Sequence, residues 1–444
     1  MRKTILTAIF LVATALTASA QLHLTLDEAL RIALSENPTI KIADMEVERY
    51  DYVKGETWGN LLPQISADGM YTRSIVKQEI AKGLSFGADN TLSATANLAL
   101  PLFAPQVWRT LRMTKTQLAA AVESARGSRI TLTAEVKKAF YNILLAEQSL
   151  AVLRESEATV QRTVDDTQIM YDNGLSSEYD LLTAQVRLSN LKPSIIQTEN
   201  SIRVAKLLLK MYLALPEEVE ISVVGSLDDM SGVVEAGGDG LSTDISENSD
   251  LRLLETQERL LQNQLKVANA SRLPSVAFFA SASYSGNDLD RSSFGAFAGG
   301  AAGATSPSKP SFYWQHPVSA GFQVSVPIFS GLTKMYKSRS IKNQIAQIGM
   351  QKEYVRQQLD VQLRSAINEL LAARATMLAQ RATVEQAVKA YRIADTRFRA
   401  GAGTILELNT AQLSETQARL NYSQAIYDYL SANAEYERIL GREQ

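Results

Sequence analysis

The sequence of 444 residues contains no cysteine and only two histidines, His23 and His316. The absence of cysteine excludes disulfides, thiolate zinc sites and cysteine nucleophiles, and two histidines leave little imidazole chemistry. An excess of charge of one sign is also missing, because 45 Lys and Arg stand against 47 Asp and Glu, a net charge of −2. A chain without a strong basic field is not expected to have nucleic acid as a partner.

The first 20 residues have the pattern of a secretory signal peptide. Two basic residues follow Met1, an apolar run extends over 5–16, and three small residues at 18–20 form a cleavage site. The run is shorter than the ~20 apolar residues of a spanning helix, which disfavours a retained anchor. We expect cleavage before Gln21. No later stretch suits a spanning helix, so strands are the expected membrane-crossing elements.

The rest of the sequence repeats itself. Ser-Glu-Asn at 35–37 returns at 246–248, and Leu-Pro at 62–63 returns at 273–274, both at an offset of 211. Further matches follow at offsets of 226 and 227, so the second copy has gained 15 residues on the way. A common offset over many residues indicates an internal two-fold repeat.

We expect two structural repeats, 21–224 and 241–444, joined by a flexible linker at 225–240. In each repeat the positions of Gly and Pro predict a helix, two strands, a very long helix, a tip and a returning helix, since 107–173 and 332–400 contain no Pro and one Gly each. The expected elements are strands at about 64–74 and 91–100 and helices at about 104–172 and 177–213 in the first repeat, and strands at about 274–284 and 318–326 and helices at about 331–399 and 404–440 in the second.

Apolar side chains in the second long helix recur in steps of three, four or seven, which predicts a coiled-coil seam. The seam residues are Ile341, Ile345, Ile348, Val355, Leu359, Leu363, Ile367, Leu370, Met377, Val384, Val388 and Tyr391. At about 1.5 Å per residue, each long helix would extend for about 100 Å. A series of shorter helices is the alternative, and the scarcity of turn residues disfavours it.

The predicted strands alternate apolar and polar side chains. Between 91 and 100 the apolar positions are Leu92, Ala94, Ala96, Leu98 and Leu100, while the alternate positions are mostly Ser, Thr and Asn. Segments of about ten residues cross a bilayer as tilted strands, although a soluble sandwich alternates as well. Aromatic residues near the strand ends favour the membrane interpretation, as interfacial girdles require. They are Tyr71, Phe103, Trp108, Phe312, Tyr313, Trp314 and Phe329.

Four strands cannot close a barrel by themselves. Open strand edges in lipid would leave backbone groups without hydrogen bonds, at several kcal/mol each. The chain is therefore expected to oligomerise, with two copies supplying eight strands or three copies supplying twelve.

The signal peptide, the duplicated unit and the helices near 100 Å make the chain resemble the TolC-type outer membrane efflux protein family. The most specific motif is the turn that ends each long helix. It reads Tyr-Asp-Asn-Gly-Leu at 171–175 followed by Tyr-Asp-Leu-Leu-Thr-Ala-Gln at 179–185, and Phe-Arg-Ala-Gly at 398–401 followed by Leu-Glu-Leu-Asn-Thr-Ala-Gln at 406–412.

The resemblance implies an α+β membrane protein in the outer membrane of a Gram-negative cell, in contact with outer membrane lipid. It implies a homotrimeric β-barrel with four strands per chain and twelve in total, continued by a long antiparallel coiled-coil α-helical tunnel in the periplasm. The function that it implies is a passive exit duct of a tripartite efflux or type I secretion system. The implied partners are a periplasmic adaptor (membrane fusion) protein and an inner-membrane pump.

The resemblance also implies which residues form the periplasmic gate. Glu407 aligns with an acidic constriction residue of the family, so three copies would form a cation-attracting ring. A second acidic ring of the family falls on Thr410, and a locking arginine falls on Gly403, so neither charge is present at these positions of this chain. The replacement lock partners would be Arg397, Arg399 and Asp180. The adaptor-docking tips would be Gly174, Leu175, Gly401 and Ala402, with both glycines also expected to act as helix C-caps.

No enzyme activity, catalytic residue, cofactor or metal site is expected. The pattern G-x-S-x-G at 83–87 lies in a predicted strand-connecting loop, whereas a nucleophile elbow needs a strand before it and a helix after it. The alternative to a channel is a periplasmic coiled-coil adaptor or scaffold without a pore. Such a protein would have no use for four alternating segments of bilayer length.

Overall fold

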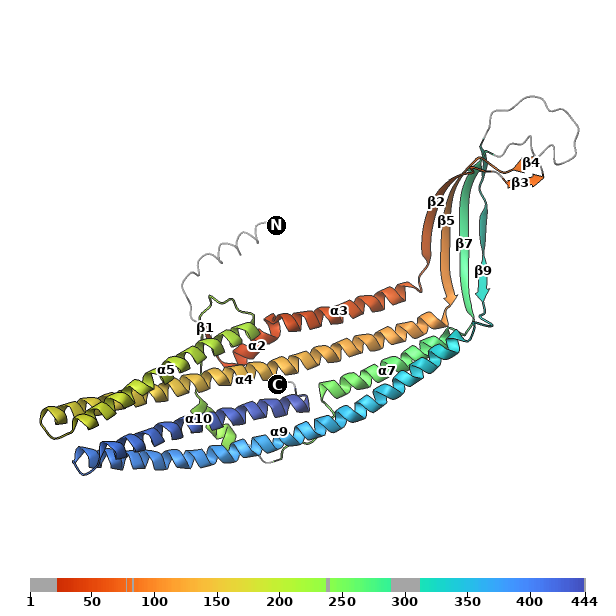
Figure 1. The fold of residues 1–444 in the computed structure, drawn as a ribbon. Coiled ribbons are helices and arrows are strands. Elements are labelled where there is room, and N and C mark those ends of the chain that lie inside the picture. The colour runs from red at the N-terminus through yellow and green to blue at the C-terminus, as the bar shows by residue number, and fades with distance from the viewer. Residues whose placement is uncertain (1–21, 77, 82–83, 237–239, 289–311, 443–444) are drawn as a thin grey trace, which may run out of the picture. The chain divides into compact units, whose positions relative to one another are not determined.

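The computed structural model describes residues 22–76, 78–81, 84–236, 240–288 and 312–442. The predicted signal peptide therefore lies outside the described residues. The elements in chain order are β1 (Leu22–Leu24), α2 (Leu26–Glu36), α3 (Pro38–Gly59), β2 (Gln64–Arg73), β3 (Gln78–Ala81), β4 (Leu84–Phe86), β5 (Asn90–Phe103), α4 (Pro105–Asp172), α5 (Glu178–Leu213), β6 (Ile221–Val223), α6 (Leu227–Ala236), α7 (Ser249–Ala270), β7 (Ser275–Asn287), β8 (Tyr313–Gln315), β9 (Val318–Ser325), α9 (Thr333–Arg399) and α10 (Ile405–Leu440) (Figure 1).

The chain divides into two compact units. Residues 1–47, 121–255 and 350–444 form one, which we call the helical unit, and residues 48–120 and 256–349 form the other, the strand unit. Among the described residues, no helix combines the length and the apolar character that crossing a bilayer would require.

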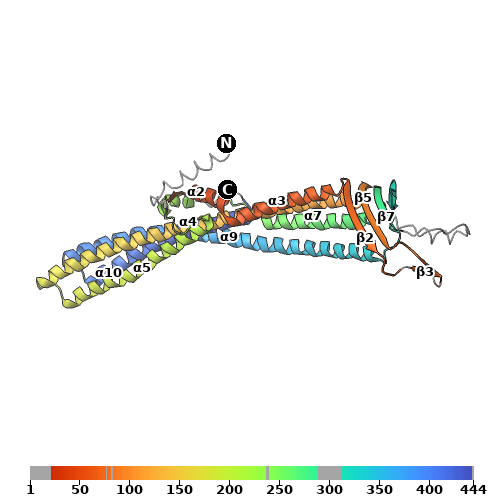
Figure 2. The ribbon, with the colours of Figure 1, turned by 90° about the horizontal axis from the view of Figure 1, so that it is seen from above.

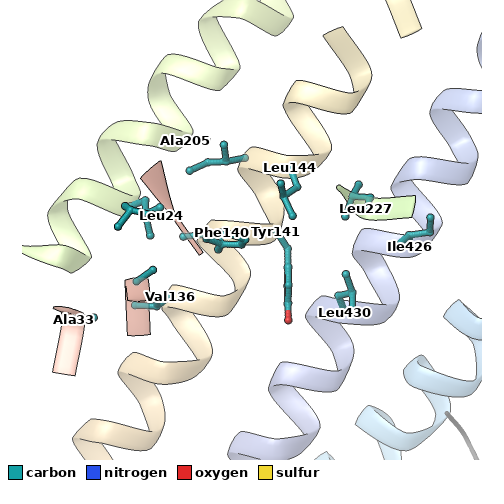
Figure 3. Packing of buried hydrophobic residues seen from close by; sticks show 14 of the residues in the cluster. Leu24, Ala33, Val136, Phe140, Tyr141, Leu144, Ala205, Leu227, Ile426 and Leu430 are labelled. Carbon is teal, nitrogen blue, oxygen red and sulfur yellow. The ribbon is translucent and has the colours of Figure 1, made fainter. Parts of the chain in front are cut away.

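The main core of the helical unit collects side chains from both halves of the sequence. Phe140 of α4 is 1% exposed and belongs to one cluster with Leu24 of β1, Ala205 of α5 and Ile426 of α10 (Figure 3). Burial of large apolar side chains of this kind contributes about 1.5–3 kcal/mol each. These contacts join segments that are far apart in the sequence.

The predicted seam of α9 follows the burial of that helix. Ile341, Leu359, Leu363, Leu370 and Met377 are buried, and the other seven seam positions are half-buried. None of the twelve is exposed. An apolar stripe at this spacing turns inward because it can bury a continuous surface against neighbouring helices.

The duplicated Ser-Glu-Asn motif has the same role in both places. The side-chain amide of Asn37 donates to Tyr212 O near the end of α5 at 2.8 Å, and that of Asn248 donates to Ile439 O near the end of α10 at 2.8 Å. In each case the amide oxygen accepts from the backbone of the next helix, at Thr39 N or Asp250 N. Each buried Asn therefore closes the end of a returning helix and caps the start of another.

The segment 225–240 is not the flexible linker that its acidic, glycine-rich composition suggests. Its middle forms helix α6, whose Leu227 and Val234 are fully buried in the main core. The composition of the segment predicted a linker, but two buried apolar residues are enough to hold a short helix against the core. The three-residue strands β1 and β6, which pair in parallel, were not predicted either, since such short strands show no periodicity.

The strand unit contains an antiparallel sheet in which β2, β5, β7 and β9 follow one another (Figure 1), and Figure 2 shows β2, β5 and β7 side by side from above. The pairing of β5 with β7 joins the first predicted strand pair to the second, with Ala96 opposite Ala282. Short strand β8 also pairs with β7, beyond the end of β9. Within the described residues, β2 pairs only with β5, and β9 only with β7. Among the described residues, the outer edges of β2 and β9 therefore have no partner strand.

Candidate functional site

The two helical hairpins of the helical unit end in turns of the same construction. Gly174 and Gly401 both adopt a left-handed backbone, each with φ of 70°. At the first tip, Gly174 N donates to Tyr171 O at 2.9 Å and Leu175 N donates to Met170 O at 2.8 Å. The second tip repeats the pattern, from Gly401 N to Phe398 O and from Ala402 N to Arg397 O, both at 2.9 Å. Both are Schellman caps, in which glycine avoids the cost of a positive φ.

The returning helices also begin in the same way. Ser177 caps α5 and Thr404 caps α10, and each forms a capping box with the acid three residues later, Asp180 or Glu407. Ser177 Oγ donates to Asp180 Oδ2 at 2.6 Å, whereas Thr404 N donates to Glu407 Oε2 at 3.4 Å. The two predicted gate acids therefore occupy equivalent places. Each carboxylate lies in the first turn, where the helix dipole favours a negative charge.

The predicted lock cations of the second tip lie close to carboxylates. Arg397 Nη2 is 3.8 Å from Glu407 Oε2 and donates to Ala402 O at 3.2 Å. Arg399 Nε lies 3.1 Å from Asp395 Oδ1, and Arg399 Nη2 lies 3.7 Å from Asp166 of the first hairpin. The hydrogen bond to Asp395 is the main cause that raises the pKa of Arg399. All these side chains are partly exposed, so each pair contributes about 1 kcal/mol or less.

Gly403 and Thr410, where the resemblance predicts a locking arginine and a second acid, are both uncharged residues of the second hairpin. A Cβ at Gly403 would lie 3.1 Å from Arg397 Cβ and 3.2 Å from Phe398 N, so a side chain there would crowd the turn. Thr410 is exposed, and its hydroxyl donates to Leu406 O at 2.7 Å within α10. Neither position supplies a charge.

All four predicted docking residues are exposed. Leu175 is 76% exposed, and a Cβ at Gly174 or Gly401 would meet nothing within 4 Å. Ala402 is exposed next to Gly401. The two turns therefore present small or apolar surface to which another protein could bind closely.

Behind the turns, an apolar cluster joins the two hairpins. Val164 of α4 and Ala184 of α5 pack with Ile405 and Leu408 of α10. Half-buried side chains of α9 complete the cluster, among them Phe398. The tips of the two hairpins are therefore held together within one chain.

The two Ala-Gln dipeptides occupy equivalent places in the sequence, but their glutamines differ in burial. Gln185 is exposed, but its counterpart Gln412 is 3% exposed, and neither its amide oxygen nor its amide nitrogen has a hydrogen-bond partner in the described part of the chain. Arg187, also near the first tip, has no partner there for Nε or Nη2, and burial lowers the pKa of its guanidinium. No sequence motif marks either group as buried. A buried polar side chain of this kind normally has a bond to protein or water.

The sheet of the strand unit has two chemically different faces. In β5, Leu92, Ala94 and Ala96 are exposed, while the alternate polar residues are half-buried. A soluble sandwich would bury the apolar face instead. On the apolar face, Phe278 packs against Phe322, with ring centroids 5.6 Å apart, yet Phe322 is 69% exposed. Apolar side chains are therefore turned outward.

Hydroxyl groups pair across the strands on the opposite face. Thr95 Oγ1 lies 3.1 Å from Ser283 Oγ, and Ser281 Oγ lies 2.8 Å from Ser319 Oγ. These pairs follow directly from the register, since Thr95 stands opposite Ser283. A wet inner face and an apolar outer face are what a strand in contact with both water and lipid requires. The aromatic residues predicted near the strand ends are all exposed.

The comparisons with known proteins agree with this arrangement. A family model described as "Outer membrane efflux protein" matches residues 29–214 and 241–442. The chain is 23% identical to Outer membrane protein TolC of Vibrio cholerae over 86% of this chain and 82% of the relative. It is 22% identical to Alkaline protease secretion protein AprF of Pseudomonas aeruginosa over 91% of this chain and 82% of the relative.

Solved structures show the same fold. The outer membrane protein VceC of Vibrio cholerae superposes with a TM-score of 0.73 at 16% identity, covering 94% of this chain and 96% of that one. The family match confirms the predicted resemblance, the outer membrane location and a role in transport rather than catalysis. It also favours the channel over the alternative of a periplasmic adaptor. From the two-faced sheet, the paired tips and a family match over most of its length, we conclude that this chain belongs to the outer membrane efflux protein family.

Proposed function

We propose that three copies of this chain form an outer membrane exit duct, with twelve strands closed into one barrel and the long helices continuing it as a periplasmic tunnel. The observation that carries the proposal is the central strand β5 of the strand unit, in which Leu92, Ala94 and Ala96 are exposed while the alternate polar side chains are half-buried. This inversion suits a strand with lipid outside and water inside. The exit duct would serve efflux or type I secretion.

The open edges of the sheet support assembly. Unpaired backbone groups on β2 and β9 would be costly in lipid, and pairing β9 of one copy with β2 of the next would satisfy both edges. Repeating this pairing closes a ring. Three copies agree with the twelve strands that membership of the family implies.

The duplicated architecture is part of the same proposal. Repeats at 21–224 and 241–444 are supported by the equal turns at Gly174 and Gly401 and by the equal roles of Asn37 and Asn248. Two repeats per chain would place six related helical hairpins around the tunnel of a trimer. The segment 225–240 would connect them as a structured link.

The periplasmic gate of this duct would lie at the hairpin tips. Glu407 would form the acidic ring, and its contact with Arg397 at 3.8 Å would help to hold the closed state. Arg399 would tie the second hairpin to the first through Asp166, and Asp180 would be the equivalent acid of the first tip. Thr410 and Gly403 add no charge, so this gate would be held by few and weak ion pairs.

The tips would also receive the periplasmic adaptor, which in turn contacts an inner-membrane pump. The small, exposed surface at Gly174, Leu175, Gly401 and Ala402 supports close docking. A bulky residue at Gly401 should block docking through its shape and through the positive φ, while the apolar cluster behind the turn is untouched.

The proposal is tested by the mass and conductance of protein extracted from the outer membrane. Light scattering with the detergent contribution subtracted should give three chains, and planar bilayers should show a cation-preferring channel. Glu407→Gln should reduce the cation preference, whereas Glu385→Gln, an exposed carboxylate on α9 away from the tips, should not. A monomer without conductance would refute the duct, and an unchanged preference in Glu407→Gln would place the ring elsewhere.

A further inference from the structure

The near-neutral net charge hides a strong separation of charge between the two units. The strand unit contains 17 Lys and Arg against 9 Asp and Glu, a net charge of +8. The helical unit contains the remaining 28 Lys and Arg against 38 Asp and Glu, a net charge of −10. A local field of this size can act on a charged surface even though the whole chain is close to neutral.

The positive charge is concentrated where the two long helices begin. Residues 105–122 of α4 and 333–349 of α9 contain no Asp or Glu. Six exposed cations in these stretches form what we call the basic collar: Arg109, Arg112, Lys115, Lys337, Arg339 and Lys342. None of the six forms an ion pair with another residue that the structure describes. Their charge is therefore available to a ligand outside the chain.

The basic collar lies next to the ends of the strands, within the same unit. Helix α4 begins two residues after β5 ends at Phe103, so at about 1.5 Å per residue Arg109 and Lys115 lie roughly 6 and 15 Å along the helix. Helix α9 starts at a similar level, because Lys334 Nζ donates to Ser271 O at 2.6 Å, close to the start of β7. With a bilayer surface at the strand ends, Arg109 and Lys115 would lie within about two Debye lengths of it, since one Debye length is about 10 Å at 0.1 M salt.

Exposed aromatic side chains accompany the cations. Trp108 is 53% exposed and stands four and seven residues before Arg112 and Lys115, which places all three on one face of α4. Tyr336 is 59% exposed and stands three residues before Arg339 on α9. Trp and Tyr mixed with Lys and Arg are typical of a membrane–water interface, where the ring and the cation both find partners. A helix surface in contact with water alone would gain nothing from exposing these two aromatic rings.

We propose that the basic collar binds the headgroups of anionic phospholipids in the membrane leaflet that borders the strand ends on the helix side. This inference rests on the proposed function, because it requires the sheet to stand in the bilayer. The phosphate of each headgroup would accept hydrogen bonds from the guanidinium groups of the collar, and the acyl chains would lie against the apolar face of the sheet. The collar would fix the depth of the barrel in the membrane.

The test compares lipid preference in the purified full-length protein. Native mass spectrometry counts the molecules of phosphatidylglycerol and phosphatidylcholine retained from an equimolar mixture, and thermal melting in detergent is followed with each lipid added. We expect at least a tenfold preference for phosphatidylglycerol that weakens as salt is raised. In R109Q/R112Q/K115Q the preference should be lost, since each cation near an anionic surface contributes on the order of a fivefold effect and three such effects exceed a tenfold preference.

The matched control removes three exposed cations from the helical unit, K192Q/R203Q/K389Q, and should keep the preference of the unchanged protein. Glutamine has nearly the same helix propensity as Lys and Arg, so both variants should fold and their lipid preferences can be compared directly. No preference in the unchanged protein, or an equal loss in the control, would overturn the inference.

Conductance of the same samples separates the two proposals. A trimer that conducts but has no preference for phosphatidylglycerol would leave the duct in place and remove the lipid site. A collar variant that keeps its lipid preference but becomes more cation-selective would show that the collar faces the lumen, which also overturns the inference. A monomer that does not conduct would refute the duct itself.

Discussion

The two units of this chain are built for different surroundings. In the helical unit, large apolar side chains such as Phe140 and Leu209 are fully buried and many charged residues are paired. In the described part of the strand unit, the buried apolar residues are only Ala270 and Ile341, while Phe322 and other large apolar side chains are exposed. Under the proposed function one chain can contain both, because each unit meets a different solvent, water for the first and lipid beside water for the second.

The largest contrast should appear when one phenylalanine is removed from each unit. Phe140→Ala would leave a cavity in the main core and should cost about 3–5 kcal/mol, seen as a marked fall in the melting temperature in detergent. Phe322→Ala, on the exposed face of the sheet, should cost far less because detergent or lipid fills the space. Equal losses would mean that the sheet packs on protein rather than lipid.

The duplicated asparagines should come next. Asn248→Ala removes the bond to Ile439 O and the cap at Asp250 N, both in buried surroundings, and should destabilise the helical unit by about 2–4 kcal/mol. Asn37→Ala should behave alike, because it removes the equivalent bonds to Tyr212 O and Thr39 N. Thermal melting of the two variants against the unchanged protein checks this. A large effect at only one position would mean that the two asparagines contribute unequally to the free energy of unfolding.

The ion pairs of the helical unit should make it sensitive to acid. Burial alone would raise the pKa of Glu435, but hydrogen bonds from Arg438 and Lys138 outweigh it and lower the pKa to about 2. The folded state thus binds this proton less tightly than the unfolded state, so its contribution is present above about pH 4.5 and is lost as the pH falls toward 2. The contribution is at most about 3 kcal/mol, and less because the side chain is 31% exposed.

Acid unfolding of Glu435→Gln measures this contribution. The variant should begin from lower stability at neutral pH and lose less than the unchanged protein between pH 4.5 and 2. Glu385→Gln, an exposed acid on α9, serves as the control and should follow the unchanged protein. If the stability of the unchanged protein and of both variants falls in parallel with pH, Glu435 keeps an ordinary pKa in the folded state.

The smallest effect on stability is expected at the second tip. Arg397→Gln removes a half-exposed contact with Glu407 at 3.8 Å and should cost less than about 1 kcal/mol. Its effect should instead appear in planar bilayers, as a higher leak conductance of the closed channel. A large fall in melting temperature with unchanged conductance would make Arg397 a structural residue rather than part of the gate.

Some features of the site could be read from the sequence because they are local. Each tip has a glycine and an acid three residues after the N-cap, and both features belong to short motifs that occur at both tips. What Gln412 does could not be read in this way, since Gln185 occupies the same motif and is exposed. Burial of Gln412 depends on α4 and α9 lying beside α10, and the contacts between α4 and α10 join residues more than 200 positions apart, as Ser156 and Thr416 do.

By itself, the sequence determined the long helices, the alternation of the strands, the repeated tips and the family, because helix and strand periods and turn residues act over a few neighbouring positions. Only the tertiary structure decided that β5 pairs with β7, that α6 anchors a segment of loop-like composition, and that the six collar cations form no ion pair within the described part of the chain. These outcomes depend on which distant segments meet. The free energy of such contacts is set by burial and pairing in three dimensions, which local patterns do not contain.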